Sequence, residues 1–192
     1  MDVPREIRTE RLYLRRWLPN DRPAFANLNA DARVNEFLLG PISRTESDAL
    51  AGRIEAHFAQ HGFGVWAMEI PGVTPFAGFI GLSIPRFEAA FTPCVEVGWR
   101  LSAEHWNKGY ATEGAKAALA FGFESLGLDE IVSFTVPDNQ RSRRVMEKIG
   151  MTHSPADDFD HPLLAEGHPL RWHVLYRIGR RSSNQLTSRA YT

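Results

Sequence analysis

This sequence has little cysteine, no excess of either charge and no long hydrophobic run. One cysteine, Cys94, occurs in 192 residues, so no disulfide can form within the chain, which fits a reducing compartment. The 22 Lys and Arg balance 23 Asp and Glu, and a net charge of -1 is not the basic excess that marks nucleic-acid-binding proteins. No stretch approaches the roughly 18 apolar residues of a membrane span or resembles a signal peptide. We therefore expect a cytoplasmic protein that contacts neither nucleic acid nor membrane.

The glycine-rich nucleotide motifs GxGxxG and GxxxxGK[ST] are absent as well, which argues against Rossmann and P-loop chemistry. No metal site is expected, because His57 and His61, although spaced as zinc ligands on a helix can be, lack the intervening Glu of the metalloprotease motif. A hydrophobic content of 43% is enough for one sizeable core. We expect one domain over residues 1–179 and a polar, mobile tail over residues 180–192.

Apolar periodicity predicts a mixed α+β fold. Strands are expected over residues 9–17, 63–70, 76–84, 95–101, 130–136 and 171–178. Helices are expected over residues 45–61, 115–126 and 139–149, with one or two short helices over 24–38. The second, third and fourth strands should form an antiparallel meander. The strand at 130–136 follows a helix and should lie parallel to the strand at 95–101, whereas residues 151–170 are rich in turn formers and should be irregular.

The stretch from Val95 to Phe123 is the centre of this pattern, because a strand runs through a glycine-containing turn into a long apolar helix. The start of a helix leaves backbone N–H groups unpaired and carries the positive end of the helix dipole, so it can bind phosphate oxygens. Gly109 would let the backbone approach such a ligand, and Lys108 adds positive charge. An ordinary connection between strand and helix has the same local pattern, so wider motifs must decide.

Two segments, WNKGYATEG at residues 106–114 and DNQRSRRVMEKIGM at residues 138–151, resemble motifs of the GNAT superfamily of acyl-CoA-dependent N-acetyltransferases, in particular its ribosomal-protein N-terminal (Rim-type) branch. In the family's pyrophosphate loop, Arg or Gln is followed by two residues, Gly, one residue, and Gly or Ala. Gly109 and Ala111 match the last two positions, and Trp106 stands at the first. The resemblance implies a single-domain fold whose mixed, mostly antiparallel sheet of about seven strands is splayed between strands 4 and 5 and flanked by helices on both faces.

The resemblance also implies which residues bind acetyl-CoA. The main-chain groups of Trp99 and Leu101 would hold the pantetheine arm. Apart from the resemblance, Gly98 makes a bulge one way for this strand to bend away from its neighbour. The pyrophosphate would lie on the loop and first helical turn, at Trp106, Asn107, Lys108, Gly109, Tyr110, Ala111 and Thr112. Asn139 would contact the cofactor, the alternative being a helix N-cap alone, and Ser142 would lie near the sulfur.

Glu96 is the first candidate for the general base, acting directly or through water; the alternative is a solvent-facing strand residue. Ser142 is the candidate acid for the departing thiolate, and the tyrosine that many family members use would be Tyr176 or Tyr110. The expected reaction is direct transfer of acetyl from acetyl-CoA to a primary amine, with no metal. A non-catalytic acyl-CoA sensor or interaction module with the same cleft is the alternative.

The acceptor amine is left open by the sequence. An α-amino group with a pKa near 8 is roughly a tenth neutral at pH 7, so a protein N-terminus would need little basic help. A small amine, such as an amino acid, a polyamine or an aminoglycoside, is the other candidate. Exposed apolar surface on the last strand would allow two copies of the chain to pair as a homodimer.

Overall fold

The computed structural model describes residues 6–180, so the expected mobile tail lies outside the described residues from residue 181 onward. Within them, the α-helices are α1 (Asp21–Ala30), α2 (Arg44–His61), α3 (Tyr110–Glu124) and α4 (Gln140–Lys148). The strands are β1 (Ile7–Arg8), β2 (Tyr13–Arg15), β3 (Val65–Ile70), β4 (Thr74–Ser83), β5 (Glu96–Leu101), β6 (Glu130–Thr135), β7 (Thr152–His153), β8 (Phe159–Asp160) and β9 (Trp172–Gly179). Two 3₁₀ turns are also present in this part of the chain: η1 (Ala103–His105) lies between β5 and α3, and η2 (Pro155–Asp157) lies between β7 and β8.

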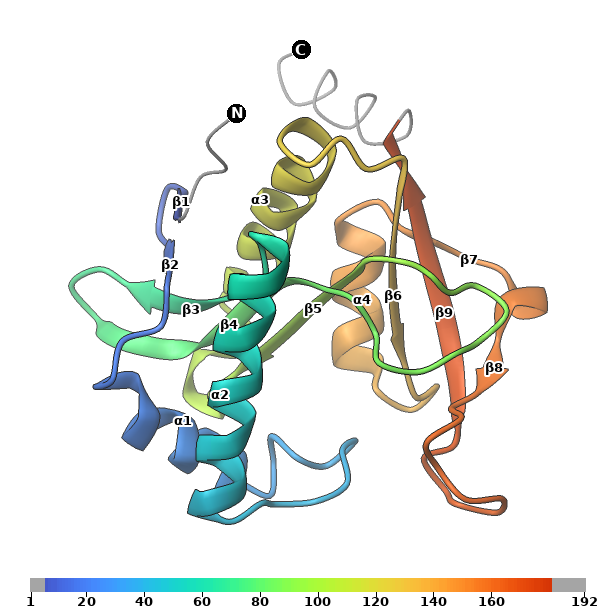
Figure 1. Cartoon of the computed structure of the whole chain (residues 1–192), viewed down its shortest axis with the longest axis horizontal. Coiled ribbons are helices and arrows are strands. Elements are labelled where there is room, and N and C mark those ends of the chain that lie inside the picture. Colours follow the sequence, from blue (N-terminus) through green and yellow to red (C-terminus); the bar gives the residue numbers. More distant parts are fainter. Residues whose placement is uncertain (1–5, 181–192) are drawn as a thin grey trace.

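The strands form one open, mixed sheet in the order β1-β2-β3-β4-β5-β6-β9-β7, with β8 paired to β9 (Figure 1). Neighbouring strands are antiparallel except β5 and β6, which are parallel. The predicted mixed fold, the meander and the parallel pair are therefore confirmed. The sheet has more strands than expected, because β7 and β8 lie in the segment predicted to be irregular and are each only 2 residues long.

The predicted helices are present, with differences at their ends. The segment 24–38 forms only one helix, α1, and residues 32–39 are turns. There the Asn35 side chain donates to two backbone carbonyls, at 2.9 and 2.8 Å, and such local bonds compete with a helical ladder. α3 ends at Glu124, shortly before Gly127, which adopts a left-handed φ of 70°.

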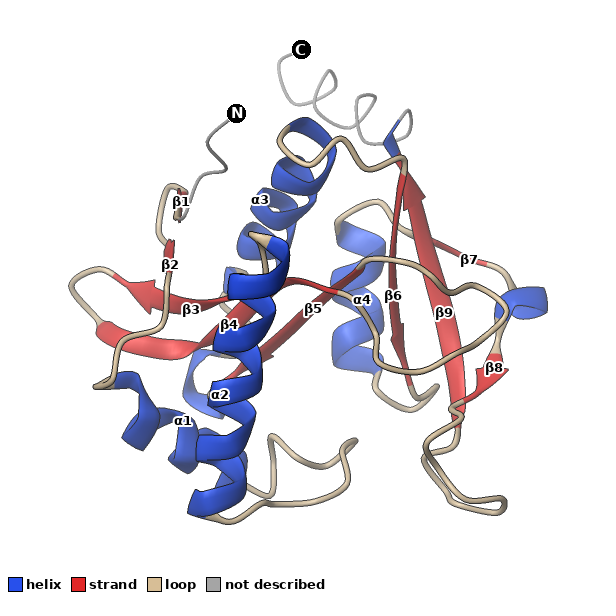
Figure 2. Cartoon of the chain, viewed as in Figure 1, coloured by secondary structure: helices blue, strands red, loops and turns tan. Residues whose placement is uncertain are grey.

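Helices cover both faces of the sheet, with α1 and α2 in front and α3 and α4 behind in Figure 2. α3 packs so closely that a Cβ at Gly114 would lie 3.0 Å from Cδ1 of Ile80 on β4. On the opposite face, the ring of Phe25 on α1 lies 5.9 Å from the ring of Phe79. Because successive side chains of a strand point to opposite faces, these two contacts assign a face to every residue of β4 and, through the register, of β5.

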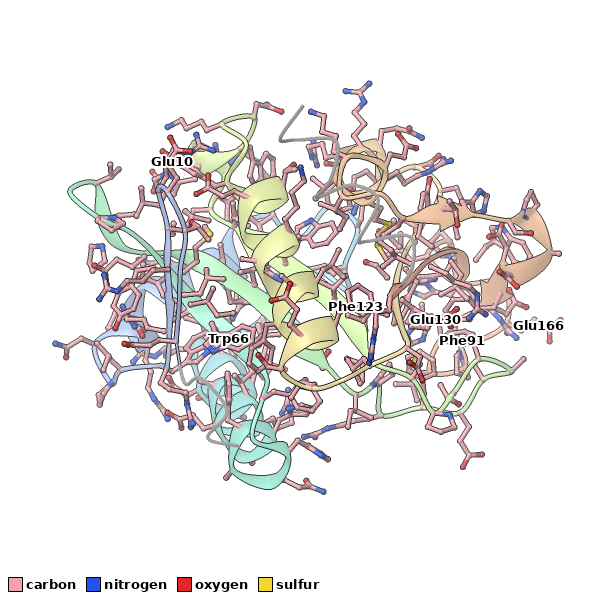
Figure 3. All side chains as sticks on the ribbon, turned by 90° about the horizontal axis from the view of Figure 1, so that it is seen from above. Glu10, Trp66, Phe91, Phe123, Glu130 and Glu166 are labelled. Atoms are coloured by element: carbon pink, nitrogen blue, oxygen red, sulfur yellow. The ribbon has the colours of Figure 1, made fainter. Side chains whose placement is uncertain are left out.

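The core is built around aromatic contacts between helices and sheet. Trp66 on β3 is fully buried and lies 5.8 Å from the ring of Phe58 on α2 and 5.0 Å from Phe121 on α3. In Figure 3 its side chain lies among those of the interior, whereas Glu10 and Glu166 lie at the periphery. Among residues 6–180, no helix has both the length and the apolar character needed to cross a membrane.

Candidate active site

β5 and β6 lie side by side at one position only. Glu96 pairs with Val132, and the N–H of Val132 donates to the carbonyl of Val95 at 2.9 Å. Beyond this pair the strands separate toward their carboxyl ends, as Figure 1 shows. α3 follows β5 through η1, and α4 follows β6 after a short loop, so both helices begin at the open end of the gap. The fourth and fifth strands expected from the sequence, at 95–101 and 130–136, are β5 and β6. The predicted splay between them is therefore present.

The gap does not arise from a bulge near Gly98, so that prediction is wrong. The register of β4 and β5 is unbroken from Ser83 opposite Glu96 to Gly78 opposite Leu101. A bulge would place two residues of one strand opposite one residue of its partner. The strands part instead because β6 leaves β5 after a single pair, while β5 stays fully paired with β4.

The main chain of β5 presents alternate residues to the gap. The N–H of Ser102 donates to the carbonyl of Ala77 at 2.9 Å, which marks this antiparallel pair as a hydrogen-bonded one. Hydrogen-bonded and non-hydrogen-bonded pairs alternate, so the register turns the N–H and C=O groups of Trp99 and Leu101 away from β4 and toward β6. These are the residues expected to hold the pantetheine arm. One of the four groups, the Leu101 carbonyl, already accepts from indole Nε1 of Trp106 at 2.8 Å.

α3 begins without a side-chain cap, unlike α2 and α4. Its N-cap is Gly109, with φ of 84°, and Asn107 before it has φ of 59°, both left-handed. In α2 the Ser43 hydroxyl accepts from the first turn, and in α4 the Asn139 side chain does so. Within the described chain, no acceptor takes a hydrogen bond from the N–H groups of residues 107–112. The turn therefore offers free N–H groups and the positive end of a helix to an anion in the gap.

Arg11, which the sequence analysis missed, lies beside this turn. Its guanidinium donates to the carbonyl of Lys108 at 3.0 Å, pairs with the Glu113 carboxylate at 2.6 Å and lies over the ring of Tyr110 at 4.9 Å. The Thr9 hydroxyl donates to the same carboxylate at 2.6 Å. The β1–β2 connection thus braces the first turn of α3 and brings a second cation to it. No local signal marks Arg11, because 97 positions separate it from Lys108 in the chain.

Glu96 lies where the gap closes, on the face opposite α3. It is paired with Ser83 of β4, and Phe79 on the same face of β4 packs against α1. The side chain keeps some exposed surface, but protein encloses the carboxyl deeply, and burial alone raises its pKa to about 8. A general base works best with a pKa near the working pH. Glu96 is thus a desolvated carboxyl and not a freely solvated strand residue.

Asn139 caps α4. Its Oδ1 accepts from the N–H of Ser142 at 3.2 Å, and its Nδ2 donates to a hydroxyl of β6 at 2.9 Å, so both ends of the amide are engaged. The Ser142 hydroxyl has no hydrogen bond to another residue between 6 and 180, and its role near the sulfur stays a prediction. The buried Tyr176 hydroxyl lies 3.2 Å from both Arg143 and Glu147 of α4, so this candidate acid is already hydrogen-bonded.

A cluster of aromatic rings extends the face that carries Glu96. Val132, the partner of Glu96, lies on this face of β6, and Phe134 two residues later lies on it too. Phe134 belongs to a cluster whose contacting rings have centroids 4.7 to 6.3 Å apart. Its members are Phe87, Phe91, Phe134, Phe159, His161 and His173. Burial lowers the pKa of both histidines, so they are neutral at pH 7 and the cluster forms an uncharged wall beside the gap.

Comparison with known proteins identifies the class. Residues 11–152 match the family model described as "Acetyltransferase (GNAT) domain", so the chain belongs to the GNAT acetyltransferase family. The uncharacterized N-acetyltransferase YnaD of Bacillus subtilis (strain 168) is 31% identical over 145 residues, which are 76% of this chain and 81% of YnaD.

Solved structures agree with this assignment. An acetyltransferase from Agrobacterium tumefaciens str. C58 superimposes with a TM-score of 0.72 at 29% identity, over 93% of this chain and 95% of that one. Mycobacterium smegmatis RimJ in complex with CoA-disulfide gives a TM-score of 0.69 over 93% of this chain and 89% of its own. At 19% identity RimJ shares the fold alone, so the Rim-type resemblance stays a prediction.

Proposed function

We propose that this GNAT acetyltransferase transfers an acetyl group directly from acetyl-CoA to a primary amine, either a protein N-terminus or a small amine. One observation carries the proposal: an uncapped helix start and a desolvated carboxyl lie at opposite ends of one gap between strands. The N–H groups of residues 107–112, with Lys108 and Arg11 beside them, suit the pyrophosphate of CoA. A protein of similar fold, RimJ, has been solved with CoA-disulfide, which supports this choice of co-substrate.

In the proposed reaction the acyl thioester lies between β5 and β6. A main-chain N–H of Trp99 or Leu101 donates to the thioester carbonyl and polarises the acyl carbon. A neutral amine attacks from the face of Glu96, so that the N–C bond forms while the C–S bond breaks. Glu96 accepts the amine proton directly or through water, and the thiolate takes a proton from the Ser142 hydroxyl, which solvent then replaces.

Replacing Gly109 by tryptophan tests the loop. A Cβ there would lie 3.2 Å from Nη2 of Arg11 at a φ of 84°, so an indole should obstruct the anion site. We expect the affinity for CoA, followed by the thermal shift that CoA causes, and the rate of thiol release from acetyl-CoA with an amine each to fall by about tenfold or more. Gly72→Trp is the matched control, because Gly72 also has a left-handed φ, of 76°, but has no atom within 4 Å of a Cβ. Undiminished CoA binding by Gly109→Trp would overturn the assignment of the loop.

Replacing Glu96 and Ser142 separately by alanine tests catalysis. With a panel of amines, we expect turnover to fall in both variants while the thermal shift by CoA is retained, because neither side chain belongs to the pyrophosphate loop. CoA binding by the wild-type protein without turnover on any amine would instead favour the non-catalytic sensor.

A further inference from the structure

A second charged side chain lies on the face of β5 that carries Glu96. Arg100 is four residues farther along the strand, so the two side chains point to the same side of the sheet. Its cross-strand partner is Phe79, and the guanidinium lies over that ring at 5.4 Å. Arg100 therefore faces α1 and the proposed path of the acceptor, and not α3.

The guanidinium is held by a buried polar network. Nη1 of Arg100 donates to Oδ1 of Asn29 on α1 at 2.7 Å. Nδ2 of Asn29 in turn donates to the hydroxyl of Ser47 on α2 at 2.9 Å. Asn29 and Ser47 are both fully buried. Because a guanidinium has N–H donors only, its bond to Asn29 requires the amide oxygen at that end, and the amide nitrogen then donates to Ser47. The network orients the guanidinium and leaves its other N–H donors for another partner.

Arg100, which is half-buried, differs from Arg15, which is buried. Arg15 is 7% exposed and binds two carboxylates, those of Asp21 at 2.8 Å and Glu69 at 2.9 Å. For Arg100, no carboxylate within the described part of the chain is close enough for an ion pair, and burial lowers its pKa to about 10. A guanidinium kept charged in such surroundings gains most from an anion supplied by a ligand.

The floor between Glu96 and Arg100 has no side chains. Gly98 lies between them on the same face, and its cross-strand partner is Gly81. A Cβ at Gly98 would meet only one atom within 4 Å, Oε1 of Glu96 at 3.7 Å, so the space above it is open. Gly98 thus leaves a short open trough on this face of β5, between the carboxyl of Glu96 and the guanidinium of Arg100.

We propose that Arg100 binds a carboxylate of the acceptor, so that the acceptor is a small amine whose carboxylate lies several bonds from its nitrogen. The inference rests on the proposed function: the amine lies at the Glu96 end of the trough and the carboxylate at the Arg100 end. Four residues of strand span about 13 Å between Cα atoms, and the two long side chains shorten the distance that the ligand must bridge. A guanidinium recognises a carboxylate through paired N–H donors.

The test uses acceptors matched in everything but the carboxylate. 4-Aminobutyrate and 6-aminohexanoate are compared with their carboxamides, and spermidine and a short peptide with a free N-terminus and an amidated C-terminus complete the panel. In the wild-type protein we expect kcat/KM for each acid to exceed that for its amide by about tenfold or more, mainly through KM. Arg100→Gln should reduce this ratio to about one, and Arg100→Lys should retain part of it.

Two further variants separate recognition from folding. Asn29→Asp places a carboxylate beside Arg100 without changing the shape of the network, so it should also abolish the preference for acids. Arg53→Gln removes an exposed arginine of α2 and should leave the ratio unchanged. An unchanged thermal shift by CoA shows that each variant is folded.

The outcomes distinguish failure of the carboxylate site from failure of the proposed acetyl transfer on which it rests. Equal turnover of acid and amide, or an acid preference that survives both Arg100→Gln and Asn29→Asp, overturns the carboxylate site and leaves acetyl transfer standing. Turnover of spermidine or the peptide alone, with KM indifferent to Arg100, does the same. No turnover of any amine overturns the proposed function and this inference with it.

Discussion

Glutamine at position 96 would keep the shape of the side chain and remove its titration, which makes it a direct test of the proposed base. The fold raises the pKa of Glu96 from its ordinary value of 4.5 to about 8 through burial alone. At pH 7 about a tenth of the carboxyl is then ionised. We expect kcat/KM of the wild-type protein to rise with pH until about pH 8, and we expect Glu96→Gln to lose about a hundredfold or more of it.

The same shift predicts how stability depends on pH. Below pH 4.5 the carboxyl is protonated in both the folded and the unfolded chain. As pH rises toward 8, the unfolded chain ionises Glu96 while the folded chain keeps the proton, so stability is lost through this window. The full difference corresponds to on the order of 5 kcal/mol, and solvent contact at the gap should reduce it to about 3 kcal/mol. Relative to the wild-type protein, Glu96→Gln should therefore become more stable by about 3 kcal/mol between pH 4 and pH 9.

Urea unfolding at a series of pH values, together with a pH–rate profile, measures both effects. Glu124→Gln is the control, because Glu124 is exposed on α3, and its difference from the wild-type protein should stay nearly flat with pH. A stability difference for Glu96→Gln that does not change with pH would refute the desolvation argument. Undiminished kcat/KM would refute the role as base.

Two further predictions concern stability, each measured by urea unfolding. Asp21→Asn leaves Arg15 buried with one carboxylate fewer and should cost about 3 kcal/mol. Asp31→Asn breaks an exposed pair and should cost much less; equal losses would contradict the burial argument. Gly78→Ala places a Cβ 2.1 Å from a backbone oxygen of β5 and should cost several times the roughly 1 kcal/mol expected for Gly72→Ala, which meets open space; similar costs would contradict the close strand packing.

Local patterns identified the elements that build the gap. Alternation through Val95, Val97 and Trp99 predicted β5, and helical spacing after Gly109 predicted α3. Asn139 was predicted to cap α4 and does so. These predictions succeeded because strand and helix periods, and the φ that glycine permits, are set by the backbone over a few residues.

The site could not be completed from the sequence because its parts converge from distant segments. The bond between Arg100 and Asn29 spans 71 positions, and Arg11 reaches its loop across 97. The predicted bulge near Gly98 was wrong because the gap depends on how far β6 follows β5, and these two strands pair at one position only while β5 stays in unbroken register with β4. Composition and spacing carry no record of such contacts.

The sequence by itself determined that Glu96, Gly98 and Arg100 share one side of a strand, because alternate residues of a strand must do so. Only the tertiary structure decided which side. α3 packs on Ile80 and α1 on Phe79, and the β4–β5 register then turns Glu96 and Arg100 toward α1. A slip of β5 by one residue would turn both charges toward α3, where the apolar face of a helix leaves them no room.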